Sequence, residues 1–366
     1  MGKVACINPK TNIPDNFKYV DLESVVGTSL IKAKLTTKQL APSRAQRVAK
    51  KGDIFYQTVR PYQKNNFLFD INNYDFQYVF STGYAQLRSE INNYFLFSYL
   101  QRQRFVNLIL RRSTGTSYPA ISSKDLSEIK IIFPRNSKEQ ENIGKIINLI
   151  DALITLQQRK LEILIKLKQS FLTKIMANNI DKNPELYFNS ASIKWLKQEL
   201  SNLTIKEFKG NTKLNDTKTG KTEYLDAERL NGNVPLFIDK PINTLKSDIL
   251  ILWDGSKAGS VYYGFEGSLG STLKAIRLNP KLVNSFFVYQ QLKSKQDVIF
   301  NKYRTPNIPH VIKNFTKVYP IYFPSMAVQN KIARFLGNLD TLIEIQQKSI
   351  KDHKVIKKYL LQKLFI

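Results

Sequence analysis

Side chains able to bind nucleic acid follow two kinds of segment in each half of this sequence. In the first half, one group follows a short apolar run and the other an aromatic-rich run: Thr58, Arg60, Tyr62, Gln63 and Lys64, then Arg111, Arg112, Ser113, Thr114 and Thr116. In the second half the corresponding groups are Asp254, Ser256 and Lys257, then Lys302, Tyr303, Arg304, Thr305 and Asn307. Arg, Lys, Asn and Gln read base edges, whereas Lys and hydroxyl side chains bind phosphates. These residues therefore predict polar DNA-contacting loops supported by strands.

Residues for catalysis or metal binding are missing from the sequence. It contains no N-P-P-[YF] or D-P-P-Y adenine methyltransferase motif, no G-x-x-x-x-G-K-[ST] phosphate loop and no H-E-x-x-H zinc site. Cys6, His310 and His353 are too few for a disulfide within the chain or a Cys/His zinc site. Asp125, followed by Glu128 and Lys130, has the spacing of a nuclease site but no convincing acidic partner before it. We expect no catalytic residue, no metal and no cofactor.

The overall charge favours a polyanionic partner. The 366 residues include 56 Lys and Arg against 29 Asp and Glu, a formal net charge of +27, which attracts nucleic acid or an acidic surface. A lysine-rich composition inherited from an AT-rich genome is the alternative explanation. The N-terminal MGKVACINPK has no apolar signal region, and no later stretch approaches 18 consecutive apolar residues. These features predict a cytoplasmic protein without membrane segments.

The two halves of the chain are copies of one unit. Four landmarks recur in the same order: KGDIFYQ from Lys51 with KSDILIL from Lys246, NNYFLFSYLQRQRFV with NSFFVYQQLKSKQDV, TSYPAI with PNIPHV, and Gln140 to Lys174 with a segment 189 positions later. A conserved order with a slowly drifting offset argues for duplication of a whole unit. The candidate DNA contacts occupy equivalent places in both copies, which favours them over isolated surface charges.

Each copy ends in a long helix with a heptad seam. In the first copy the seam is Ile143, Ile147, Ile150, Ile154, Gln157, Leu161, Leu164, Lys168, Phe171 and Ile175. In the second it is Ile332, Leu336, Leu339, Ile343, Gln346, Ile350, His353, Lys357, Leu360 and Leu364. Two such helices in one chain predict an intramolecular antiparallel coiled coil. The alternative is that each is an ordinary core helix of its own domain.

The motifs together resemble the specificity subunit of type I restriction-modification systems. The resemblance rests on GDI or SDI before a strand, the DGS…AG…GSLGST stretch, TPNIPHV, and FP…Q…I…LD…I…QQ in both halves. The first copy departs from it, because TVRPYQKNN replaces the glycine-rich DGSKAG stretch. The resemblance implies a non-catalytic subunit that reads a bipartite sequence in double-stranded DNA. It also implies two methyltransferase partners, with restriction and translocase subunits joining for cleavage.

The resulting interpretation is a mixed α/β (α+β) protein with pseudo-twofold symmetry. We expect a first target-recognition domain over residues 1–135, a spacer helix over 136–180, a second recognition domain over 181–322 and a second helix over 323–366. Two other functions stay open. One is the specificity component of a related combined restriction-methylation enzyme, and the other is a nucleic-acid-binding scaffold without sequence preference.

Overall fold

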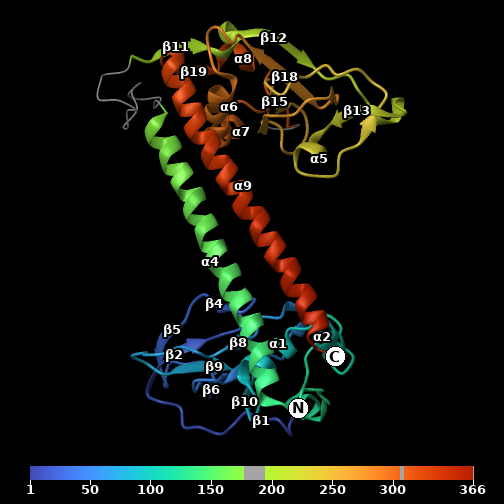
Figure 1. Cartoon of the computed structure of the whole chain (residues 1–366). Helices are drawn as coiled ribbons and strands as arrows, with labels where there is room; N and C mark the ends of the chain where they lie inside the picture. The colour runs from blue at the N-terminus through green and yellow to red at the C-terminus, as the bar shows by residue number, and fades with distance from the viewer. Residues whose placement is uncertain (177–193, 306–308, 366) are drawn as a thin grey trace. The chain divides into compact units, whose positions relative to one another are not determined.

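The computed structural model describes residues 1–176, 194–305 and 309–365. The chain divides into two compact units (Figure 1). The first contains Met1–Arg159 with Lys348–Ile366, and the second contains Lys160–Gln347. Each unit therefore contains part of both long helical segments, one from each sequence repeat.

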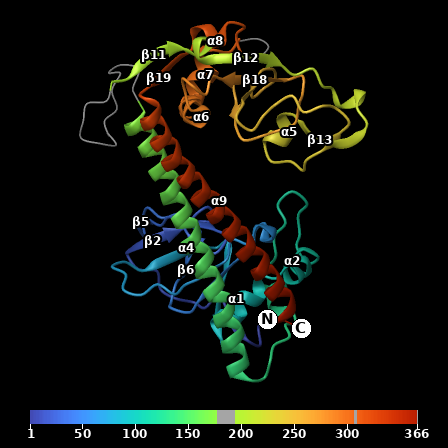
Figure 2. The same cartoon turned by 45° about the horizontal axis from the view of Figure 1, so that its top comes forward.

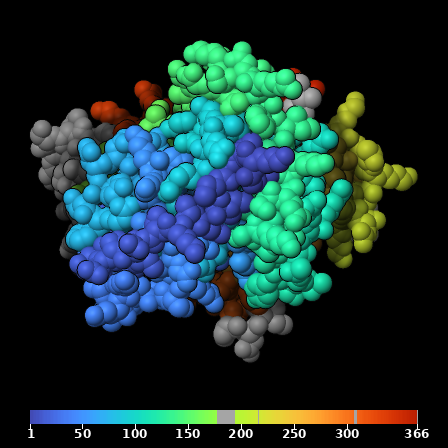
Figure 3. All heavy atoms as spheres, turned by 90° about the horizontal axis from the view of Figure 1, so that it is seen from below, coloured from blue at the N-terminus to red at the C-terminus, as the bar shows by residue number. Residues whose placement is uncertain are grey.

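The first unit is built on two four-stranded sheets. One has the order β1 (Ala5–Ile7), β10 (Tyr84–Ser89), β7 (Ile54–Gln57), β8 (Phe67–Leu68), and all its neighbours are antiparallel. The other has the order β5 (Lys34–Thr37), β2 (Asn16–Val20), β9 (Tyr78–Ser81), β6 (Ala45–Val48), in which β2 and β9 are parallel. A hairpin joins β3 (Val25–Val26) and β4 (Ser29–Leu30). Figure 3 shows the N-terminal segment lying across one face of this unit.

Short helices complete the first unit and lead into the long one. They are α1 (Asn93–Leu100), α2 (Gln103–Leu110) and α3 (Ser123–Glu128), with the 3-10 turn η1 (Pro61–Gln63), followed by α4 (Ser137–Ile175). The aromatic-rich spacing from Asn92 predicts one amphipathic helix in each copy, but this is wrong for the first copy, where the run forms two helices. The helix stops because Arg102 is extended, with φ −66° and ψ 138°, between α1 and α2. The second repeat also breaks into two helices, at Lys295.

The second unit contains a four-stranded, a three-stranded and a two-stranded sheet. The strand orders are β12 (Thr204–Lys209), β18 (Leu273–Leu278), β15 (Ile249–Leu252), β16 (Val261–Tyr262); β14 (Phe237–Ile238), β13 (Thr219–Leu225), β17 (Ser268–Leu269); and β11 (Leu196–Glu199), β19 (Pro320–Phe323). Its helical elements are η2 (Leu200–Leu203), η3 (Leu214–Asp216), α5 (Ala227–Leu230), α6 (Ser285–Ser294), α7 (Gln296–Lys302), α8 (Phe315–Val318) and α9 (Met326–Lys363).

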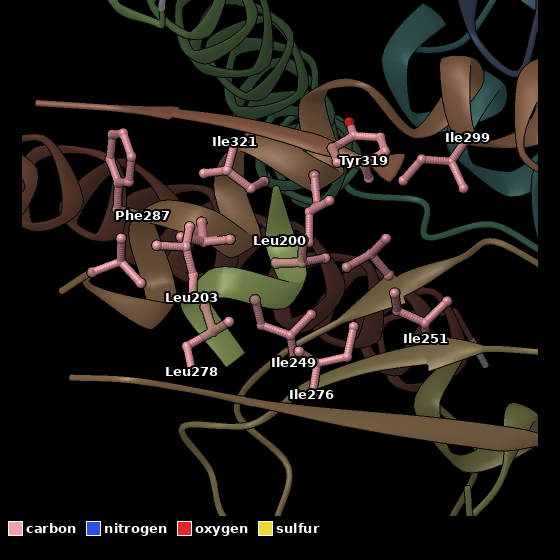
Figure 4. Close-up of a cluster of buried hydrophobic side chains, with 14 of the residues drawn as sticks. Leu200, Leu203, Ile249, Ile251, Ile276, Leu278, Phe287, Ile299, Tyr319 and Ile321 are labelled. Atoms are coloured by element: carbon pink, nitrogen blue, oxygen red, sulfur yellow. The ribbon is translucent and has the colours of Figure 1, made fainter. Parts of the chain in front are cut away.

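The largest core of the second unit lies between its four-stranded sheet and its helices. Ile249 and Ile251 of β15 and Ile276 of β18 face Phe287 of α6 and Leu200 of η2 (Figure 4). All five are fully buried. The buried strand predicted at SDILIL is therefore confirmed, and its counterpart β7 is buried along its whole length.

The GDI and SDI motifs fix the turn that leads into the buried strand. Asp53 accepts a hydrogen bond from the Lys50 N–H and pairs with both Nε and Nη2 of Arg88, each at 2.9 Å. Asp248 does the same with the Leu245 N–H and Arg277. The two carboxylates are fully buried, so the bidentate arginine supplies the compensating charge that burial requires. These hydrogen bonds raise the pKa of both arginines.

The FP…Q motif joins the start of the long helix to the start of the aromatic helix. The Gln140 side chain donates to the Pro134 carbonyl at 2.8 Å and accepts from the Asn92 N–H at 3.2 Å. Gln329 repeats both contacts with Pro324 and Asn284. Because each asparagine also caps its helix, one glutamine fixes two helix starts.

The long helices pack antiparallel to each other inside each unit. In the first unit Asp151 pairs with Lys357, and Ile143 and Ile147 share a core with Phe365. In the second, Lys168 pairs with Asp340, and Phe171 meets Phe335 with ring centroids 4.9 Å apart. Residues later in α4 therefore contact residues earlier in α9, so the two helices run in opposite directions. Every residue of the predicted seam is buried or half-buried.

The two ion pairs are equivalent under the sequence repeat. Asp340 lies 189 positions after Asp151, and Lys357 lies 189 positions after Lys168. The two seam lysines therefore each pair with an aspartate of the opposite repeat. Among the residues that the structure describes, no helix is long and apolar enough to cross a membrane.

Candidate nucleic-acid interface

Two loops that are far apart in the sequence cross at the end of strand β7. The Arg60 N–H donates to the Pro119 carbonyl at 2.8 Å, and the Ile121 N–H donates to the Thr58 carbonyl at 3.1 Å. Arg60 adopts left-handed backbone geometry, with φ 53°. The two groups of residues predicted in the first half of the sequence are therefore neighbours in the fold. Together they form an exposed polar corner, which we call the first loop crossing (residues 58–64 and 111–121).

The second unit builds the same crossing at the end of strand β15. Gly255 donates to the Pro309 carbonyl at 3.0 Å, and the Val311 N–H donates to the Trp253 carbonyl at 3.0 Å. The residues in these two hydrogen bonds are the repeat equivalents of those in the first crossing. Gly255, with φ 108°, is the equivalent of Arg60 and also has a positive φ. We call this corner the second loop crossing (residues 253–257, 302–305 and 309–311). Asn307, predicted here as a DNA contact, lies outside the described residues.

Each crossing contains an arginine. It lies in the earlier of the two loops in the first unit and in the later loop in the second unit. In the first, the Arg60 guanidinium lies 4.2 Å from the ring centroid of Tyr118. In the second, Arg304 Nη1 donates to the Ser256 carbonyl at 3.1 Å. Both side chains are half-buried, and each guanidinium contacts the other loop of its crossing. An arginine placed in this way can bind a guanine edge or a phosphate.

Comparison with known proteins identifies both copies. A family model described as the type I restriction modification DNA specificity domain matches residues 10–169 and again 198–352. The chain belongs to this family.

Two relatives with similar sequences are described as type I specificity subunits. The MjaVIII specificity subunit of a type I restriction enzyme from Methanocaldococcus jannaschii is 33% identical over 40% of this chain and 35% of its own length. A putative type I specificity subunit from Mycoplasma genitalium is 26% identical over 69% of this chain and 65% of its own length. This chain thus spans about a third of the first relative and about two thirds of the second.

The fold of a solved specificity subunit is similar too. A type I S subunit from M. genitalium superposes with a TM-score of 0.71 at 19% identity, over 100% of this chain and 94% of its own. A chain from a structural study of the assembly of a type I restriction-modification system superposes with a TM-score of 0.55 at 20% identity, over 100% of this chain and 96% of its own. The family-model match, with one matched segment in each repeat, makes the two repeats two specificity domains.

Several predicted residues of the two specificity domains are exposed at the crossings. In the first they are Tyr62, Gln63, Arg111, Arg112, Thr114 and Thr116, and in the second Ser256, Lys257 and Lys302. Gln63 accepts from the Gln57 side chain at 2.9 Å, and Arg112 lies 4.0 Å from Glu128. Their role in DNA binding stays a prediction.

Other predicted residues already use their polar atoms or rings within the fold. Thr58 is buried and its hydroxyl donates to the Gly83 carbonyl at 2.8 Å. The Tyr303 ring packs against Phe315 and Tyr319, so we do not expect it to stack on a base. Thr305 Oγ1 lies 3.0 Å from Nδ1 of His310, and Asp254 pairs with Lys209 at 2.6 Å. Lys64 is half-buried.

Two residues of the specificity domains were missed from the sequence. Tyr118, which is 61% exposed, supports Arg60, and Lys209 neutralises Asp254. Tyr118 could have been found, because it directly precedes the repeated Pro119. Lys209 could not, since it lies on another strand 45 positions before Asp254. Among the described residues, no group of three or more His, Cys, Asp or Glu could hold a metal ion.

Proposed function

We propose that this chain is the non-catalytic DNA-specificity subunit of a type I restriction-modification complex. In this proposal it works in the cytoplasm and reads a bipartite duplex target, one half-site per specificity domain. The observation that carries the proposal is the loop crossing. It occurs once in each copy of a specificity domain, with equivalent hydrogen bonds and an arginine at each.

The proposed domain boundaries follow the repeat. Residues 1–135 and 181–322 would be the two target-recognition domains, and residues 136–180 and 323–366 the two spacer helices. In this view α4 and α9 form an antiparallel coiled coil that sets the separation of the half-sites. The two equivalent ion pairs and the buried seam within each unit support that arrangement.

The outer faces of the long helices offer docking sites for two methyltransferase subunits. Leu156 and its repeat equivalent Ile345 are 64% and 60% exposed, and Leu167 and Ile356 are 41% and 48% exposed. Large apolar side chains exposed at repeat-equivalent positions are a feature of partner-binding surfaces. Two equivalent sites fit two copies of one partner. Restriction and translocase subunits would join this complex for cleavage.

The experiment is methylation-site mapping in cells with and without this chain. A bipartite motif that disappears when the chain is deleted supports the proposal. A motif that persists would refute it. If the enzymatic partner recovered with the chain is one polypeptide that both methylates and cleaves, the chain is the specificity component of a combined enzyme instead.

Competition binding separates sequence reading from a general scaffold. A duplex carrying the mapped motif should outcompete a scrambled duplex at every salt concentration, because base contacts persist when phosphate contacts weaken. Equal competition by both duplexes would support the scaffold without sequence preference.

A further inference from the structure

A strongly basic cavity lies inside the first unit, beside the first loop crossing. It has a volume of about 510 Å³, and six of its lining residues are cations: Lys64, Arg102, Arg104, Lys354, Lys357 and Lys358. None of its lining residues is acidic. The residues come from the end of η1, from the junction of α1 and α2, and from the C-terminal part of α9. Figure 2 shows α2 beside the C-terminal end of α9.

Two buried donors at this cavity have no acceptor in the described part of the chain. They are Nη1 of Arg102 and Nε2 of Gln101, and both residues are 6% exposed. The Arg102 guanidinium lies 4.4 Å from the ring centroid of Tyr99 and 5.2 Å from that of Phe365. The arginine thus packs against two aromatic rings, and no carboxylate of the described residues pairs with its charge. Leaving buried donors unpaired costs free energy, so the site favours an acceptor from outside.

The cations around the cavity repel one another. Burial lowers the pKa of Lys64, and the charges of Lys357 and Lys358 lower it further. Burial also lowers the pKa of Arg102, and the charge of Arg104 adds to this effect. Among the ion pairs of the described residues, only Lys357 of the six has a carboxylate partner, Asp151. A bound anion would relieve this repulsion.

The second unit shows that the fold does not need these charges. At the offsets of the repeat, Ser294 and Gln296 replace Arg102 and Arg104, and Ile165 and Gln169 replace Lys354 and Lys358. Lys168 alone corresponds to a cation, Lys357, and keeps the same aspartate contact. The ion pair therefore belongs to the shared scaffold. The other cations are particular to the first unit, which indicates a function other than stability.

We propose that this cavity binds a backbone phosphate of the DNA held at the first loop crossing. The proposal deepens the function proposed above and rests on it. Lys64 connects the two sites, since it ends the η1 turn that follows Arg60 and also lines the cavity. A duplex seated on the crossing carries its phosphates past this turn. Guanidinium and ammonium groups around a preformed cavity are the donors that phosphate prefers.

The test uses the full-length chain with Arg104 and Lys358 changed to glutamine, the residue that the other repeat carries at both positions. Both side chains are exposed, so the fold should persist, and circular dichroism melting would verify it. The matched control is Lys348→Gln with Lys351→Gln. It removes the same charge from exposed positions of α9 that do not line the cavity.

The readout is the affinity for fluorescent duplexes of several sequences across a salt series. We expect the slope of log affinity against log salt to become shallower by about 1 for each phosphate that the variant no longer binds, equally for every duplex. The control should keep the wild-type slope. A cavity variant with the slope of the wild type, or a control whose slope changes as much as that of the cavity variant, overturns the phosphate site alone. Absence of any wild-type affinity for DNA overturns the proposed function as well.

One further outcome would reassign the cavity. If the cavity variant binds DNA like the wild type but no longer retains a methyltransferase subunit, the occupant is an acidic segment of that partner. The phosphate proposal would then be wrong.

Discussion

Reversing one of the two helix ion pairs tests the antiparallel arrangement directly. Asp151→Lys places a second lysine against Lys357, where both native side chains are only 19% and 18% exposed. Breaking a fully buried pair costs roughly 3 to 5 kcal/mol, and this pair keeps some solvent, so we expect about 2 to 3 kcal/mol. Adding Lys357→Asp restores opposite charges, and the coupling energy between the two changes should be about 1 to 3 kcal/mol.

The repeat itself provides the control for this cycle. If the helices packed in parallel and in register, Asp151 would face Asp340, and Lys168 would face Lys357, since each pair is separated by the repeat offset. Only the antiparallel arrangement places each aspartate against a lysine. Lys168→Asp should therefore fail to rescue Asp151→Lys, and it should add a second defect by facing Asp340.

The assay is hydrogen exchange of α9 together with thermal melting of four variants: Asp151→Lys, Lys357→Asp, and Asp151→Lys combined with either Lys357→Asp or Lys168→Asp. Local exchange is needed because a chain of two units need not unfold in one step. A destabilisation of about 2 to 3 kcal/mol corresponds to a decrease of roughly 4 to 12 °C in melting temperature for a unit of this size. Equal rescue of Asp151→Lys by Lys168→Asp and by Lys357→Asp would refute the pairing described here.

Three further predictions concern function. Arg60→Ala should relax one half-site of the methylated motif and Arg304→Ala the other, each at a cost of roughly 1 to 3 kcal/mol in binding to cognate duplexes; equal effects on both half-sites would contradict separate readers. Inserting seven residues into each long helix, between Asp151 and Lys168 and between Asp340 and Lys357, lengthens each helix by about 10 Å. The spacing between the two half-sites of the mapped motif should then grow by about three base pairs at roughly 3.4 Å each. The bases read in each half-site should not change. An unchanged gap in a folded, active variant would show that the helices do not set the spacing. The purified chain with magnesium, a methyl donor and ATP should neither methylate nor cut duplex DNA nor hydrolyse ATP, and reproducible turnover by the chain alone would exclude a non-catalytic subunit.

The sequence predicted the elements that depend on local pattern and on the repeat. The buried strands β7 and β15 followed from continuous apolar runs, the long helices from heptad spacing, and the two polar loop groups from their equivalent places in the repeat. The break at Arg102 was not predicted, because the aromatic-rich run has no Gly or Pro to mark it, and the contact of Arg102 with Phe365 has no local signal. The same reason explains the aspartate partners of Lys168 and Lys357. A heptad pattern assigns a lysine to the seam, but its partner depends on which way the second helix runs.

The basic cavity could not be predicted for a related reason. Lys64, Arg102 and Lys358 come from three distant segments, and each alone is an ordinary basic residue in a lysine-rich chain. Only the fold places them around one space. Comparison of the repeats then shows which of these charges the scaffold does not need.

The position of Phe365 has a consequence for the order in which the protein is made. This residue is buried in the core of the first unit, with its ring centroid 5.2 Å from that of Phe95. The ribosome reaches it 270 positions after Phe95, or roughly 14 to 54 seconds later at 5 to 20 residues per second. During synthesis the part of α1 that Phe365 covers, at Phe95 and Tyr99, therefore stays without this contact while the whole second repeat is translated. The unit whose synthesis begins first is therefore completed last. We expect chaperones to bind mainly to the N-terminal half of the nascent chain.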